Sequence, residues 1–145
     1  PQLFRGIKFN WGVIICSEDF CGNVTNEYLI LYIACVLWTI GYDTIYAYQD
    51  LKDDKKNSIK STAVLFEDKG KYLVLSSYTL MFIMIGYLSF NQGIEMLKLL
   101  VYFGIFIYIV VNIIRWDHKS EQNSGKKFRQ NNLFGAIIFL YLLSF

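Results

Sequence analysis

The sequence has little proline and little charge. Pro1 is the only proline among the 145 residues, so no internal proline interrupts a helix or a strand. Charged residues make up 18% of the chain, against about 25% in soluble domains. Hydrophobic residues account for 54%. This composition excludes a disordered chain and a soluble nucleic-acid-binding domain, and it indicates an integral membrane protein.

Cysteine and histidine are also scarce. The three cysteines, Cys16, Cys21 and Cys35, form no CxxC pair. We interpret them as buried apolar residues, which argues against a disulfide-stapled scaffold and against a cysteine-based metal site. The single histidine, His118, lies in a charged segment and is expected to be solvated.

Long apolar stretches take the place of charge. Residues 72–90 and 99–114 contain no charged side chain, and each stretch is about long enough to cross a bilayer as a helix. The apolar segments lack the alternating pattern of barrel strands. We expect helices at residues 3–17, 27–48, 71–90, 96–114 and 132–145. The predicted fold class is therefore all-α, a polytopic transmembrane helix bundle.

The positive charges support this topology. If five helices zigzag across the membrane, the N-terminal flank and the segments near residues 49–71 and 115–131 share one side. Of the 14 Lys and Arg residues, only Lys98 lies on the other side. Because cytoplasmic loops carry an excess of Lys and Arg, we expect the large loops to be cytoplasmic.

Four carboxylates gather at the end of the second predicted helix: Asp43, Asp50, Asp53 and Asp54. If the helix continues through them, Asp43, Asp50 and Asp54 fall within roughly 40° of one stripe. Such a stripe repels itself, and a hard divalent cation would compensate it. Magnesium suits carboxylate oxygens and commonly bridges to the phosphates of a substrate. The alternative is a solvated loop whose acids balance the neighbouring lysines.

A second polar segment follows the acids. Lys60, Ser61 and Thr62 precede the next apolar helix, and Ser61 or Thr62 is placed to cap its first turn. The first amides of a helix favour an anion, and Lys60 would add a positive charge. Together with a magnesium-holding stripe, this segment would suit a diphosphate substrate whose lipid tail lies among the helices.

The acidic segment resembles a known family. It reads Tyr42-Asp43-Thr44-x-Tyr46-Ala47-x-x-Asp50-x-x-Asp53-Asp54 and is followed by Ile59-Lys60-Ser61-Thr62-Ala63. This string resembles the second aspartate-rich motif of the 4-hydroxybenzoate polyprenyltransferases, which are UbiA-type membrane prenyltransferases. The resemblance spans all 145 residues and includes Pro1-Gln2, Trp38 and Gln130-Asn131-Asn132. One departure is Ser58, where the family usually has glycine.

The resemblance implies a fold and a reaction. The family fold is a bundle of nine transmembrane helices, and residues 1–145 look like the C-terminal part of that single domain, with about five of the helices. The family's first motif, N-D-x-x-D-x-x-x-D, has no counterpart here, so we expect this chain alone to be inactive. The family transfers a polyprenyl group from polyprenyl diphosphate to the ring of 4-hydroxybenzoate, a step of ubiquinone biosynthesis that uses Mg²⁺.

The resemblance also assigns roles to residues. Asp50 and Asp54 would be the metal ligands, and Asp43 a third catalytic carboxylate. Lys60 would neutralise the leaving diphosphate. Asn131 and Asn132 either cap the last predicted helix or bind substrate, so the candidate substrate-binding residues are Lys60, Ser61, Asn131 and Asn132.

Two alternatives stay open. One is a UbiA-type enzyme with another aromatic acceptor, such as a naphthoate, homogentisate or haem. The other is half of a membrane transporter, which would place ionisable residues near the middle of its helices, whereas the acids here gather at one interface. The short loops favour a bacterial inner membrane over a mitochondrial one.

Overall fold

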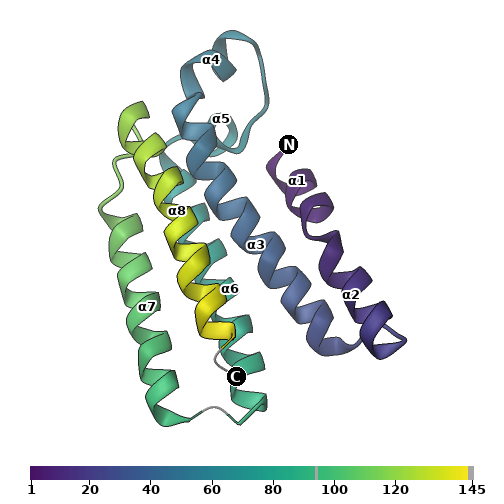
Figure 1. Ribbon diagram of the computed structural model, residues 1–145. Helices are drawn as coiled ribbons and strands as arrows, with labels where there is room; N and C mark the ends of the chain where they lie inside the picture. The colour runs from purple at the N-terminus through teal and green to yellow at the C-terminus, as the bar shows by residue number, and fades with distance from the viewer. Residues whose placement is uncertain (94, 144–145) are drawn as a thin grey trace.

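A computed structural model describes residues 1–93 and 95–143, and all regular structure within them is helical. The elements are α1 (Gln2–Phe9), α2 (Trp11–Cys21), α3 (Asn26–Gln49), α4 (Leu51–Lys56), α5 (Thr62–Phe66), the 3₁₀ turn η1 (Glu67–Lys69), α6 (Gly70–Asn91), α7 (Met96–Ile114) and α8 (Glu121–Leu142). The long helices lie side by side as a bundle (Figure 1). The predicted all-α fold class is confirmed.

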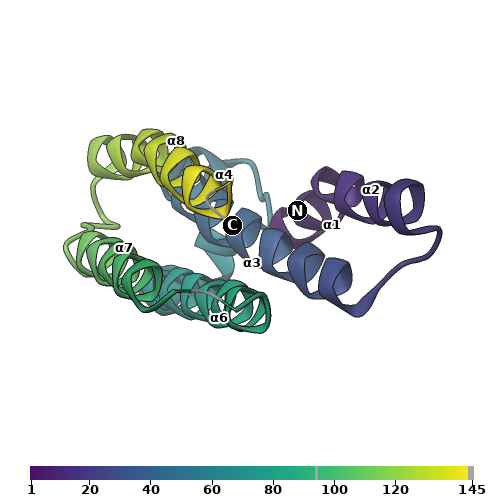
Figure 2. The same cartoon turned by 60° about the horizontal axis from the view of Figure 1, so that its bottom comes forward.

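Helix α3 is the centre of the bundle. Helices α1 and α2 lie on one side of it, and α6, α7 and α8 lie on the other (Figure 2). Its small and apolar side chains, such as Ala34 and Ile45, are buried against the core that α6 and α8 complete with Val74, Tyr78 and Ile138. Because α3 contacts helices of both groups, it fixes the position of the side chains at its own end relative to both groups of helices.

Within the described residues, three helical segments are long and apolar enough to cross a membrane: Asn26–Gln49, Thr62–Asn91 and Met96–Ile114. Large apolar side chains on their outer faces are exposed, including Ile83, Phe103 and Ile107. Helices that are apolar on the outside as well as the inside are typical of a bilayer environment. The chain is therefore part of a multi-pass membrane protein.

The connections follow the expected zigzag. The α3–α6 connection, which contains α4 and α5, lies at the same end of the bundle as the α7–α8 connection, and the α2–α3 connection lies at the opposite end (Figure 1). The segment expected as a loop at residues 49–63 is partly helical, because α4 spans Leu51–Lys56. The polar residues of both large connections are thus gathered at one end.

Two helix boundaries differ from expectation. The helix expected at residues 3–17 is divided at Asn10, whose side-chain amide donates to the Gly6 carbonyl (2.8 Å) and to Thr39 Oγ1 (2.9 Å). The helix expected at residues 132–145 begins at Glu121, because Ser120 Oγ accepts from the Asn123 amide (3.2 Å) and caps a polar first half. Residues 144 and 145 lie outside the described residues.

The expectation for the cysteines was wrong in part. Cys16 and Cys21 are exposed on α2, and Cys35 is half-buried on α3. Helix α2 contacts little besides α1 and α3, so most of its surface faces outward even though it is apolar (Figure 2).

The close approach of α3 to α6 requires Gly41. A Cβ atom there would lie 2.4 Å from Cε1 of Tyr78, whose side chain is fully buried. We expect Gly41→Ala to lower the free energy of unfolding by about 1–3 kcal/mol, as overpacking of a core does. Thermal unfolding of the purified protein in detergent measures this effect.

Gly104→Ala on α7 is the matched control. A Cβ at Gly104 meets nothing within 4 Å, so this variant should be neutral or more stable by up to about 1 kcal/mol. Equal losses in both variants would show that contact with Tyr78 is not the cause.

Candidate functional site

A buried carboxylate and an arginine join α1 to α3. The side chain of Asp43 is 3% exposed, and Nη1 of Arg5 donates to its Oδ1 at 2.5 Å. The other oxygen, Oδ2, is buried and has no hydrogen-bond partner among the residues that the structure describes. Arg5 is half-exposed, with 50% of its side chain accessible. The pair therefore has a buried anionic end and an accessible cationic end.

The acids Asp50 and Asp54 line one cavity. It has a volume of about 200 Å³, and Arg5 and Tyr46 also form part of its wall. Helix α3 ends at Gln49, and Asp50 has φ −101° and ψ 11° between α3 and α4. The expected stripe on one continuous helix was therefore wrong. Asp50 and Asp54 nevertheless meet at one cavity, and Asp43 connects to it through Arg5.

The fourth acid lies elsewhere. Asp53 lines a second polar cavity of about 560 Å³ with Asp50, and α8 supplies Glu121, Lys126 and Arg129 to its wall. Nζ of Lys52 lies 2.7 Å from Oε1 of Glu121 across the same gap. This contact raises the pKa of the Lys52 ammonium. Asp53 is therefore surrounded by charges of both signs.

The donor set bears on which metal could bind. Within residues 1–93 and 95–143, no group of three or more His, Cys, Asp and Glu side chains could hold a metal ion. This excludes a closed, all-protein cage in that part of the chain. Two carboxylates at one cavity do fit Mg²⁺, which is usually bound by one or two carboxylates, several waters and the phosphates of a substrate.

The start of α5 is capped from within the protein. Ser61 Oγ accepts from the Val64 amide (3.4 Å), so the predicted cap is confirmed for Ser61. The Thr62 amide donates to Oε1 of Gln2 at 3.2 Å. Two amides that were expected to be available to an anion thus already have acceptors.

Lys60 is exposed and lies beside the acids rather than among them. It lines a cavity of about 370 Å³ that shares Gln2 and Ser61 with the cavity of Asp50 and Asp54. Lys60 and the acid pair thus line two cavities that share Ser61, which is buried.

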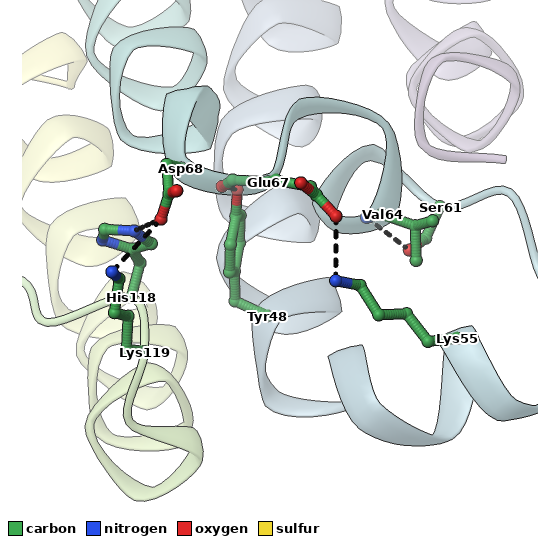
Figure 3. Close-up of polar contacts among 8 residues, drawn as sticks. All are labelled: Tyr48, Lys55, Ser61, Val64, Glu67, Asp68, His118 and Lys119. Carbon is green, nitrogen blue, oxygen red and sulfur yellow. Dashed lines mark hydrogen bonds and ion pairs between the residues drawn. The ribbon is translucent and has the colours of Figure 1, made fainter.

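A network of polar contacts holds the α3–α6 connection in place (Figure 3). The hydroxyl of Tyr48, at the end of α3, donates to the carbonyl of Glu67. The carboxylate of Glu67 in turn pairs with Nζ of Lys55 on α4 at 2.8 Å. Glu67 therefore joins the end of α3, α4 and the start of α6, and it fixes the loop between the acids and the next membrane helix.

The same network reaches the α7–α8 connection (Figure 3). Oδ1 of Asp68 lies 3.4 Å from His118 Nε2 and 3.4 Å from Lys119 Nζ. The prediction that His118 is solvated was wrong, since its side chain is 18% exposed and its ring packs edge-on against Tyr48. Sequence reasoning missed this contact because the two segments are far apart in the chain.

Asn131 lies inside α8 and not at its start. It is buried, and its Oδ1 accepts from Trp38 Nε1 (2.9 Å) and from the Tyr78 hydroxyl (3.0 Å). It thus connects α8 to α3 and α6, and the helix-capping interpretation was wrong. The neighbouring Asn132 is exposed.

Arg5 is the site residue that sequence reasoning overlooked. An arginine inside a short apolar segment, Leu3-Phe4-Arg5-Gly6-Ile7, was the available signal. Ionised residues within apolar helices usually have a specific partner and a function, and that partner is Asp43.

Comparisons with known proteins match nearly the whole chain. The model of the UbiA prenyltransferase family matches residues 1–142. The 4-hydroxybenzoate geranyltransferase 1 of Lithospermum erythrorhizon is 38% identical over 99% of this chain and 47% of its own length. A 4-hydroxybenzoate octaprenyltransferase of Coxiella burnetii is 40% identical over 99% of this chain and 50% of its own length.

A third relative gives a similar match. The mitochondrial 4-hydroxybenzoate polyprenyltransferase of Bos taurus is 36% identical over 97% of this chain and 38% of its own length. The chain thus spans about half the length, or less, of these curated relatives. No solved structure gives a significant match.

The loop after α4 contains a strained residue. Ser58 has φ 56°, in the left-handed region that favours glycine. We expect Ser58→Gly to raise the free energy of unfolding by about 1 kcal/mol, because the Cβ atom no longer opposes this backbone conformation. Gly22→Ala is the inverse control, since Gly22 has φ 69° in open space and should lose a similar amount. A loss of stability in Ser58→Gly would contradict the assigned strain.

Asn131 should contribute to stability much more than Asn132. Replacing it with alanine leaves the half-buried Trp38 donor and the buried Tyr78 donor without their acceptor, so we expect a loss of about 2–4 kcal/mol. Asn132→Ala should change stability by less than about 0.5 kcal/mol. Thermal unfolding in detergent compares the two variants, and similar losses would argue against the shared acceptor.

Proposed function

The chain belongs to the UbiA prenyltransferase family, and we propose that the protein containing it transfers a polyprenyl group from polyprenyl diphosphate to 4-hydroxybenzoate in ubiquinone biosynthesis. The observation that carries this proposal is the pair Asp50 and Asp54, which lines one cavity at the polar end of a membrane bundle. The relatives named above supply the acceptor, since each is called a 4-hydroxybenzoate prenyltransferase.

The reaction breaks one bond and forms another. The bond between the allylic carbon of the prenyl chain and the diphosphate oxygen breaks, and its electron pair leaves with the diphosphate. The ring carbon ortho to the hydroxyl of 4-hydroxybenzoate then bonds to the allylic carbon, and that ring carbon loses its proton. Both steps create charge that water would quench, so the bundle must exclude water around the allylic cation.

The acids of this chain would hold the metal. Asp50 and Asp54 are the proposed ligands of Mg²⁺, with Asp43 as the third carboxylate of the site. When bound, Mg²⁺ supplies positive charge that stabilises the departing diphosphate. Two carboxylates leave coordination positions for water and for phosphate oxygens, which matches the usual preference of this ion.

The neighbouring polar residues would bind the substrate. Lys60, at the adjoining cavity, would place an ammonium beside the diphosphate. Ser61 accepts from Val64, so its own hydroxyl proton would be available to a phosphate oxygen. Asn131 would act by orienting Trp38 and Tyr78, while the exposed Asn132 would contact substrate directly.

We infer the orientation from the charges and the compartment from the short loops. Eleven of the 14 Lys and Arg residues lie within residues 49–71 and 115–131, and these two segments lie toward one end of the bundle (Figure 1). Because cytoplasmic loops carry an excess of Lys and Arg, we infer that this end faces the cytoplasm. We infer a bacterial inner membrane, with the acid cavity open to the cytoplasmic surface where a soluble acceptor arrives.

The test is prenylation of radiolabelled 4-hydroxybenzoate by membranes that contain the full-length protein. Product should require Mg²⁺, and Asp50→Ala or Asp54→Ala should each lower the rate by at least about 100-fold, because each removes a proposed ligand of the Mg²⁺ that would stabilise the leaving group. Asp53→Ala is the matched control and should keep activity within about tenfold of wild type, since Asp53 lies outside the cavity of Asp50 and Asp54.

Other results would change the conclusion. Product only with a different aromatic acceptor would replace the substrate and keep the site. Full activity of both Asp50→Ala and Asp54→Ala would remove the metal assignment. Turnover by residues 1–145 alone would show that the acids of this chain suffice, against the expectation that they supply only part of the metal site.

A further inference from the structure

Arg5 is a charged residue that the proposed reaction does not yet use. It lies on α1, its Nη1 is 2.5 Å from Asp43 Oδ1, and its side chain also lines the cavity of Asp50 and Asp54. A guanidinium carries five N–H donors in a fixed plane. Because half of the side chain is accessible, donors other than the one that meets Asp43 can reach a ligand in the cavity.

Stability alone does not account for the pair. A buried ion pair gains little net free energy, because the desolvation of both charges offsets their attraction. In this pair Asp43 is almost completely buried, and its Oδ2 has no hydrogen-bond partner within the described residues. A buried oxygen without a partner is costly and needs a reason. What the arrangement does achieve is a cation held at a fixed point of a cavity wall that also contains Asp50 and Asp54.

The geometry of this cation selects an anion with several oxygens. Asp50 and Asp54 lie in the same small cavity as Arg5. Once those acids are compensated, the guanidinium is the remaining group there that can donate in a plane to paired oxygens. Arginine matches phosphate oxygens in this way, whereas a lysine acts as a point charge.

We propose that Arg5 binds the diphosphate group of the prenyl substrate and that Asp43 is a positioning residue, which holds the guanidinium toward Asp50 and Asp54. The identity of the ligand rests on the proposed function. The roles of the two charges are complementary: Asp43 anchors one edge of the guanidinium on α3, and the free edge from α1 meets the ligand. The site thereby depends on the contact between these two helices.

The experiment measures binding of inorganic pyrophosphate to the purified full-length protein in detergent, by calorimetric titration, both with Mg²⁺ and with a chelator. Arg5→Gln should weaken binding by about 10- to 100-fold, the effect of losing hydrogen bonds from a charged donor. In prenylation assays the same variant should raise KM for prenyl diphosphate and leave KM for 4-hydroxybenzoate unchanged. The control variant Lys8→Gln removes a positive charge from the exposed side of α1. It should leave the pyrophosphate affinity and the KM for prenyl diphosphate unchanged.

The role of Asp43 is tested by substituting it both in the wild-type protein and in the Arg5→Gln variant. Asp43→Asn should weaken pyrophosphate binding when Arg5 is present and should add no loss in Arg5→Gln, because a positioning residue acts through its partner. If Arg5→Gln alone fails to fold, the double variant Arg5→Gln/Asp43→Asn removes both charges, leaves no unpaired buried carboxylate, and carries the binding measurement.

Three results distinguish the assignments. Unchanged pyrophosphate binding in Arg5→Gln overturns the proposal and leaves a structural ion pair. A raised KM for 4-hydroxybenzoate with unchanged pyrophosphate binding also overturns the proposal, since Arg5 would then bind the carboxylate of the acceptor. If wild-type protein binds pyrophosphate through Arg5 but prenylates no 4-hydroxybenzoate, the proposed function fails and the assignment of Arg5 stands.

Discussion

The structure depends on the constraint that a polar group inside an apolar bundle must find its partner within the protein. Lipid offers no hydrogen bonds, so each buried donor or acceptor specifies which helices meet. The clearest case is Asn131, whose single oxygen accepts from Trp38 on α3 and Tyr78 on α6. That contact fixes three helices around one atom. Gly41 then lets α3 and α6 approach closely enough for the Tyr78 ring to lie between them.

The same constraint explains why the charges gather at one end. The contacts of Glu67 with Tyr48 and Lys55, and of Asp68 with His118, tie the large connections to each other at the polar end of the bundle (Figure 3). Buried charges in the core would need equally good partners at a higher desolvation cost. The proposed reaction generates charge, and this end of the bundle would supply fixed dipoles and side-chain charges beside an apolar interior.

Composition and local motifs predicted much of the fold, because they act over short distances. The stretches without charge located α3, α6 and α7, and the acidic motif located the cavity of Asp50 and Asp54. What failed were properties set by tertiary contacts. The search for apolar runs missed the polar first half of α8, which Ser120 caps. The expected end of the second helix at residue 48 was within one residue of Gln49, but helical periodicity could not show that Asp43 would meet Arg5 on another helix.

The different proposed roles of Asp43 and of the pair Asp50 and Asp54 follow from their different burial. Asp43 is inside the bundle and already has a cation, so a metal ion would have to displace Arg5 to reach its Oδ1. Asp50 and Asp54 face a cavity instead. Two carboxylates bind Mg²⁺ weakly without further oxygen ligands, and the proposed diphosphate substrate would supply such oxygens. Metal and diphosphate should therefore bind this half of the site cooperatively, because each supplies the charge that the other lacks. A binding site organised in this way holds the metal most firmly when substrate is present, which is when the departing charge must be stabilised.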